Sequence, residues 1–241
     1  MLTPRENTTL FGHQAARQSF MHAFHSPRCP HAWIIGGAVG VGKATFAFHH
    51  ARYVLSGRQD GNTHFDENDP LHRRIVAFSH GDLWAVGGGE EDEIGIEPIR
   101  ALTHFLHQTP LEGGWRVLII DGADCLNRNA ANALLKCLEE PPARTLFFLT
   151  TSLPESLLPT IRSRCHFLPL NPLDGNDVAA VLKSQGLTPP SFFERAEGSP
   201  GRLMRFMEGN GIQLYEDLEK VLEGGACSLF YSCLWWRKRI L

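Results

Sequence analysis

A glycine-rich turn between a short apolar run and a helical pattern constrains this chain more than any other feature. The turn, residues 36–43, reads GGAVGVGK. His31–Ile35 precedes it as a short strand, and Lys43–Leu55 follows it as a helix. In this context backbone N–H groups and a helix N-terminus surround a phosphate. The sequence therefore predicts a phosphate-binding loop in an α/β fold, with a plain strand-to-helix turn as the alternative.

The turn fits the Walker A pattern up to its last position. The candidate phosphate-binding residues are Gly37, Gly40, Gly42 and Lys43. Ala44 stands where Ser or Thr normally coordinates Mg²⁺. Thr45 is a poor substitute because the next residue of a helix points about 100° away. We therefore expect the loop to accept a phosphate of ATP. We do not expect productive Mg²⁺ coordination there.

A second acidic position follows a continuous apolar run. Trp115–Ile120 has the pattern of a parallel strand buried on both faces, and Asp121 stands at its end. Asp121 resembles a Walker B carboxylate; the alternative is a strand-end aspartate that caps a turn. Gly122 replaces the glutamate that polarises the attacking water in hydrolysing enzymes of this type. Together, Ala44 and Gly122 predict a degenerate ATPase site.

The remaining pattern divides the chain into a strand-rich part and a helical part. Alternating strands and helices up to about residue 170 predict a parallel sheet flanked by helices. We expect further strands at Arg73–Phe78, Thr145–Thr151 and His166–Leu170, an exposed loop at Ala85–Glu93, and helices at Gly12–Phe24, from Glu97, from Asn127 and at Pro159–Arg164. After residue 170, three short helices are expected at Asp174–Gln185, Ser191–Ala196 and Gly201–Glu208. They predict a small helical lid.

Composition excludes several classes of protein. No apolar run approaches the roughly 20 residues that span a bilayer, and Met1–Leu10 lacks the pattern of a signal peptide. The six cysteines include no CxxC pair, so reduced thiols in the cytoplasm are expected. The net charge of -3 gives no strong field toward nucleic acid.

Three further segments give the chain a family resemblance. They are Asn127–Pro142 (NRNAANALLKCLEEPP), Leu158–Cys165 (LPTIRSRC) and Leu10–His13 (LFGH). With the phosphate loop, they resemble subunits of the bacterial DNA polymerase III clamp loader, an AAA+ assembly that opens the sliding clamp and places it on primed DNA. The resemblance covers about residues 8–208. The degenerate Walker positions resemble the delta-prime subunit more than the ATP-hydrolysing tau/gamma subunit.

The resemblance implies roles for three more residues. Arg164, in Ser163–Cys165, corresponds to an arginine finger that reaches the ATP site of a neighbouring subunit; the alternative is a helix-end cation paired with a carboxylate. Thr150 matches the sensor-1 position, or is an ordinary strand-end hydroxyl. Arg202 matches the sensor-2 position of the lid, or follows a plain Gly/Pro turn.

The implied partners are the tau/gamma and delta subunits, with the sliding clamp and primed DNA reached through the assembly, and no membrane. The resemblance also implies three domains: an AAA+ core at 1–170, a lid at 171–208, and the remnant of a collar domain at 209–241. Residues 227–241 (CSLFYSCLWWRKRIL) do not resemble family sequence. We interpret them as a truncation or a frame change; a short amphipathic membrane or partner anchor is the alternative.

A second departure concerns zinc. Many clamp-loader subunits have a four-cysteine zinc module after the first helix of the ATPase domain, but Leu55–Arg74 contains only His64 and His72 as potential ligands. We therefore expect no zinc.

Two other functions stay open besides the non-hydrolysing clamp-loader subunit. The first is a catalytically active AAA+ ATPase similar to the tau/gamma motor. The second is a small-molecule P-loop kinase, for which the LEEPP and SRC segments would have no role.

Overall fold

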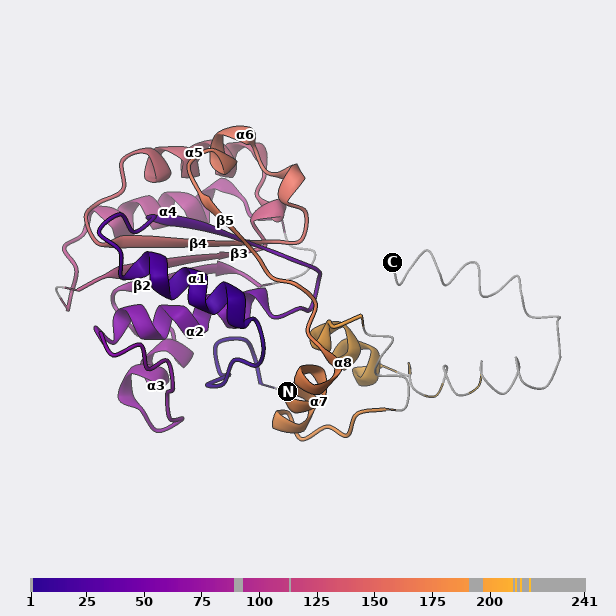
Figure 1. Ribbon diagram of the computed structural model, residues 1–241. Helices are drawn as coiled ribbons and strands as arrows, with labels where there is room; N and C mark the ends of the chain where they lie inside the picture. Colours follow the sequence, from indigo (N-terminus) through magenta and orange to yellow (C-terminus); the bar gives the residue numbers. More distant parts are fainter. Residues whose placement is uncertain are drawn as a thin grey trace. The chain divides into compact units, whose positions relative to one another are not determined.

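The computed structural model describes residues 2–88, 93–112, 114–190 and 197–209, together with residues 211, 213 and 217. It divides into two units, Met1–Gly201 and Arg202–Leu241. The first unit is an α/β structure built on a five-stranded parallel sheet (Figure 1). The predicted domain boundaries at 170 and 208 stay predictions.

The sheet has the order β2-β3-β4-β1-β5. The strands are β1 (Ala32–Gly36), β2 (Leu83–Gly87), β3 (Arg116–Asp121), β4 (Thr145–Thr151) and β5 (His166–Pro169). The first six α-helices are α1 (Gln14–Phe24), α2 (Lys43–Leu55), α3 (Pro70–Val76), α4 (Ile96–His107), α5 (Arg128–Glu139) and α6 (Pro159–Arg162). Because all the strands are parallel, their carboxyl ends meet at one edge, where ligands bind in open α/β sheets.

Alternate residues of the central strands serve two separate cores, because successive strand side chains point to opposite faces. In β3, Val117 and Ile119 pack with α1 and α2, whereas Leu118 and Ile120 pack with α4, α5 and α6. Figure 1 shows these two helical layers on opposite sides of the sheet. The continuous apolar runs in β3 and β4 are therefore explained by burial on both faces, as predicted.

Two predicted elements are wrong. Arg73–Phe78, expected as a strand, lies mostly in α3. Asp69 caps this helix by accepting a hydrogen bond from the backbone N–H of Leu71, and Pro70 occupies its first turn. The first residues of Ala85–Glu93, expected as a loop, belong to β2, which pairs with β3 from Leu83 to Gly87. Residues 89–92 lie outside the described residues.

The predicted lid is only partly described. α7 (Gly175–Ser184) begins at the N-cap Asp174, and α8 spans Pro200–Glu208. The helix predicted at 191–196 and the tail at 227–241 lie outside the described residues, as does most of 210–223. Within the described ranges, no helix has the length and apolar character needed to cross a membrane.

Candidate nucleotide-binding site

The glycine-rich turn has the backbone conformation of a phosphate loop. It connects β1 to α2 at the carboxyl edge of the sheet. Gly40 has φ 79° and Gly42 has φ 108°, in the left-handed region that side chains disfavour. Gly42 is also the N-cap of α2, so the exposed N–H groups of this helix open onto the turn. The sequence prediction of strand, loop and helix is confirmed.

The ammonium group of Lys43 lies over this loop. Its Nζ atom donates hydrogen bonds of 2.9 Å to the carbonyl oxygens of Gly37 and Ala38 and to Oγ of Ser152, just beyond β4. Two of these acceptors belong to the loop itself, and the third follows β4. A phosphate entering the loop would therefore meet the positive charge there and would exchange with some of these contacts.

Asp121 and Thr150 form a second part of the site, on the neighbouring strands β3 and β4. The Thr150 hydroxyl donates to Oδ1 of Asp121 at 2.6 Å and accepts from the backbone N–H of Gly122 at 2.9 Å. Burial raises the pKa of the Asp121 carboxyl, while the Thr150 hydrogen bond and the positive charge of Lys43 lower it. The structure thus brings together the predicted Walker A, Walker B and sensor-1 positions.

Two positions beside Lys43 and Asp121 lack the side chains that a magnesium-dependent site would use. Ala44 offers no hydroxyl beside the loop, and Gly122, with φ 85°, offers no carboxylate after Asp121. Across the described parts of the chain, no group of three or more His, Cys, Asp or Glu residues is arranged to hold a metal ion.

The segment Leu10–His13 adjoins the phosphate loop. The Nε2 atom of His13 lies 3.0 Å from the carbonyl oxygen of Val41. Burial lowers the pKa of His13, and the nearby Asp177 of α7 opposes this shift. The N-terminal segment therefore contacts the loop through His13.

The first turn of α8 also contacts the loop. The backbone N–H of Gly201 donates to the carbonyl oxygen of Gly40 at 2.9 Å, and a Cβ at Gly201 would lie only 2.9 Å from Cα of Gly40. The predicted sensor-2 turn is thus brought to the phosphate loop at Gly201. Arg202 itself belongs to the second unit.

Arg164 lies away from the loop, just after α6. Helix α6 packs in the core on the opposite face of the sheet from α2. The Nη2 atom of Arg164 lies 2.8 Å from Oε1 of Glu139. The Nη1 atom of Arg164 donates to the carbonyl oxygen of Thr160 at 2.9 Å. Sequence reasoning did not single out Glu139, although it belongs to the quoted LEEPP segment.

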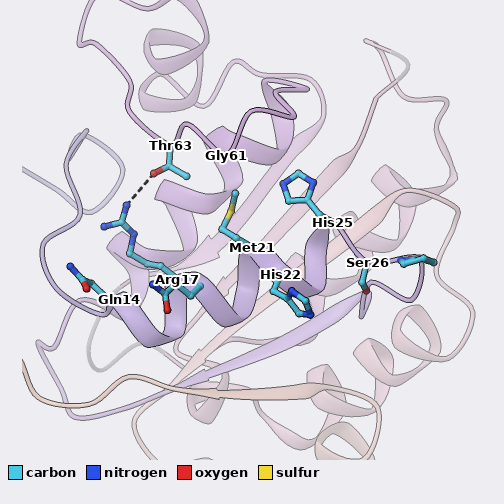
Figure 2. A pocket seen from close by; sticks show the side chains of 10 residues that line it. Gln14, Arg17, Met21, His22, His25, Ser26, Gly61 and Thr63 are labelled. Carbon is cyan, nitrogen blue, oxygen red and sulfur yellow. Dashed lines mark hydrogen bonds between the residues drawn. The ribbon is translucent and has the colours of Figure 1, made fainter.

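A separate groove of about 920 Å³ lies beside α1. Figure 2 shows Arg17, His22 and His25 along this groove. Nη2 of Arg17 donates a hydrogen bond to the hydroxyl of Thr63 at 3.2 Å. None of the residues predicted to bind nucleotide lines this groove.

Comparison with known proteins gives consistent relatives. A family model described as "DNA polymerase III, delta subunit" matches residues 12–174. The chain is 38% identical over 136 residues to DNA polymerase III subunit delta' of Pseudomonas aeruginosa, covering 56% of this chain and 41% of that protein. It is 30% identical over 213 residues to the Escherichia coli K12 subunit delta', covering 85% and 63%. The chain therefore spans less than two thirds of the length of these relatives.

Solved structures show the same fold at low sequence identity. A gamma subunit-related protein of DNA polymerase III from Thermotoga maritima has a TM-score of 0.50 and 18% identity, covering 79% of this chain and 56% of that chain. A structure describing katanin self-assembly has a TM-score of 0.52 and 20% identity, covering 89% and 74%. These similarities confirm the predicted AAA+ type of α/β fold.

Proposed function

Because this chain belongs to the DNA polymerase III delta subunit family, we propose that it acts as a delta-prime-like subunit of the clamp loader, which places the sliding clamp on primed DNA. The relatives that carry the delta' name support this assignment. In this proposal the chain contributes to assembly geometry and to a neighbour's ATP site, and it does not hydrolyse ATP itself.

The observation that carries the proposal is a phosphate loop without its hydrolytic partners. Gly40, Gly42 and Lys43 have the geometry of such a loop. Ala44 and Gly122 remove the magnesium-coordinating hydroxyl and the water-polarising carboxylate. Since these two groups supply the chemical step, the site can hold a nucleotide without turning it over.

ATP is the nucleotide that we propose for this site. The loop N–H groups and Lys43 would bind its phosphates, and Thr150 would orient Asp121 beside them. Arg202 is proposed only for the sensor-2 role that the resemblance implies. We propose no zinc and no hydrolytic step at this site.

Arg164 supplies the chemistry that we propose in trans. A planar guanidinium beside the γ-phosphate of a neighbouring subunit's ATP offsets the negative charge that develops during phosphoryl transfer. The position of Arg164 after α6, on the opposite face of the sheet from α2, supports a role outside its own phosphate loop.

The proposed partners are the tau/gamma and delta subunits, with the clamp and primed DNA reached through the assembly in the cytoplasm. We propose an AAA+ core at residues 1–170 and a lid at residues 171–208. The chain itself makes any DNA contact through phosphates rather than bases.

The competing proposal is an active ATPase of the tau/gamma type. Relatives named DNA polymerase III subunit gamma, such as the one from Buchnera aphidicola (30% identity over 181 residues, 75% of this chain and 49% of that protein), keep this alternative open. ATP turnover by the isolated chain that Lys43→Ala abolishes would favour it over our proposal.

The test is reconstitution of a clamp loader from this full chain with tau/gamma and delta subunits. We expect a stable complex whose DNA-stimulated ATPase falls on Arg164→Ala. Arg162→Ala is the matched control, because Arg162 lies two residues away and pairs with Glu155 at 2.6 Å on the surface. Failure of the chain to join the complex, or equal rates for Arg164→Ala and wild type, would contradict the proposal.

A further inference from the structure

The guanidinium of Arg164 is held at two points by its own chain. Oε1 of Glu139 lies 2.8 Å from Nη2, and the carbonyl oxygen of Thr160 accepts from Nη1 at 2.9 Å. Glu139 is the last residue of α5, whereas Thr160 lies within α6. Two helices on the same face of the sheet thus fix both ends of the guanidinium plane.

We propose that Glu139 is the positioning residue for Arg164: it orients the guanidinium before a neighbouring subunit's nucleotide arrives. This inference rests on the proposed function, in which Arg164 acts in trans. An arginine side chain loses rotamer freedom when it is fixed, so a finger that is already oriented needs less ordering at the interface.

The exposure of the pair supports positioning rather than a firm lock. The side chains of Arg164 and Glu139 are 35% and 48% exposed. Exposed ion pairs are weak, because solvent screens the charges and the side chains lose freedom. A bond of this strength limits the directions of the side chain, yet a phosphate with more negative charge can compete with it.

The geometry leaves the finger able to act. Arginine has five N–H donors, and the contacts with Glu139 and Thr160 use two of them. A third contact, to Oγ of Ser163, is long at 3.4 Å. A phosphate oxygen can therefore approach the guanidinium edge while Thr160 still holds it.

The test compares Glu139 variants in the reconstituted loader. We expect Glu139→Ala to lower the kcat of ATP hydrolysis by about two- to fivefold, with KM for ATP within about twofold of wild type, because orientation is lost while nucleotide binding is kept. Glu139→Gln should retain most of the rate, since its amide oxygen still accepts from Nη2. Glu140→Ala, at the adjacent exposed carboxylate, is the matched control.

Two further variants separate the possible failures. Adding Glu139→Ala to Arg164→Ala should cause no additional loss, because there is then no guanidinium to position. If Arg164→Ala lowers the rate and Glu139→Ala does not, positioning is wrong and the proposed function stands. If Glu139→Ala and Glu139→Gln both exceed the wild-type rate, the carboxylate restrains the finger, which also overturns the inference. If Arg164→Ala leaves the rate unchanged, the proposed function itself fails.

Discussion

At the residue scale, the backbone at Gly122 disfavours any side chain. It follows Asp121 with φ 85°, and its N–H donates to the hydroxyl of Thr150 at 2.9 Å. A Cβ there would meet only Cys125 Sγ at 3.5 Å, an ordinary contact. The obstacle to a side chain is therefore the left-handed backbone and not crowding.

We predict that Gly122→Glu lowers the free energy of unfolding by about 1–2 kcal/mol and restores no ATPase activity, because the backbone is strained and Ala44 still lacks a hydroxyl. Urea unfolding and an ATPase assay of the full chain check this. Gly122→Ala should lose a similar amount of stability, since the cost lies in the backbone. A stable Gly122→Glu variant that hydrolyses ATP would contradict the prediction.

The site residues differ in how far the sequence could predict them. The Walker A and Walker B patterns could be recognised in the sequence, because each pattern has a physical reason for its spacing. They predict Gly40, Gly42, Lys43 and Asp121 as candidate site residues. The contact between Gly201 and Gly40 and the pairing of Glu139 with Arg164 join residues far apart in the chain. Only the folded arrangement reveals such contacts.

At the element scale, helix α5 begins at a side-chain cap that the sequence predicts and ends beside Arg164. Asn127 caps this helix by accepting from the N–H of Ala130 at 2.9 Å, and its amide donates to Glu93 at 2.8 Å. The helix then runs to Glu139 beside Arg164. The cap therefore stabilises the helix that ends at Glu139.

We predict that Asn127→Ala lowers the free energy of unfolding by about 1 kcal/mol, because the first turn of α5 loses its side-chain acceptor. Asn127→Ser, which keeps an acceptor oxygen, should recover most of this loss. Urea denaturation followed by far-ultraviolet circular dichroism measures both. Equal destabilisation by Ser and Ala would show that the cap is not the source.

The two wrongly predicted elements show where local sequence preferences do not decide the structure. Arg73–Phe78 contains Ile75 and Val76, which favour a strand, but Asp69 and Pro70 form a helix start just before them. In β2, the following glycines suggested a loop, while pairing with β3 stabilises a strand. Tertiary pairing decides such short segments, whereas the doubly buried β3 and β4 could be predicted from their apolar runs.

At the scale of the whole molecule, the helix that begins at the phosphate loop also introduces two histidines into the core. His49 and His50 on α2 are 3% and 0% exposed. Burial, together with electrostatic repulsion from His50, Arg17 and Arg52, lowers the pKa of His49 to about 2. Burial lowers the pKa of His50 to about 3. Both side chains are therefore neutral in the folded protein across the physiological range.

This burial makes the stability of the molecule depend on pH. In the unfolded chain a histidine has a pKa of about 6.5, so below this pH the unfolded state binds protons that the folded state cannot accept. The contribution of these histidines to stability is present above pH 6.5 and is lost as the pH falls through this value, by about 2 kcal/mol per buried histidine between pH 7 and 5.

We predict that His50→Phe, which keeps an aromatic ring between Phe20 and Phe46, loses about 2 kcal/mol less than wild type between pH 7 and pH 5, as measured by urea unfolding at each pH. His104→Asn, on the exposed side of α4, is the matched control. A His50→Phe variant that follows the wild-type curve would show that His50 takes up a proton without unfolding the core around α2.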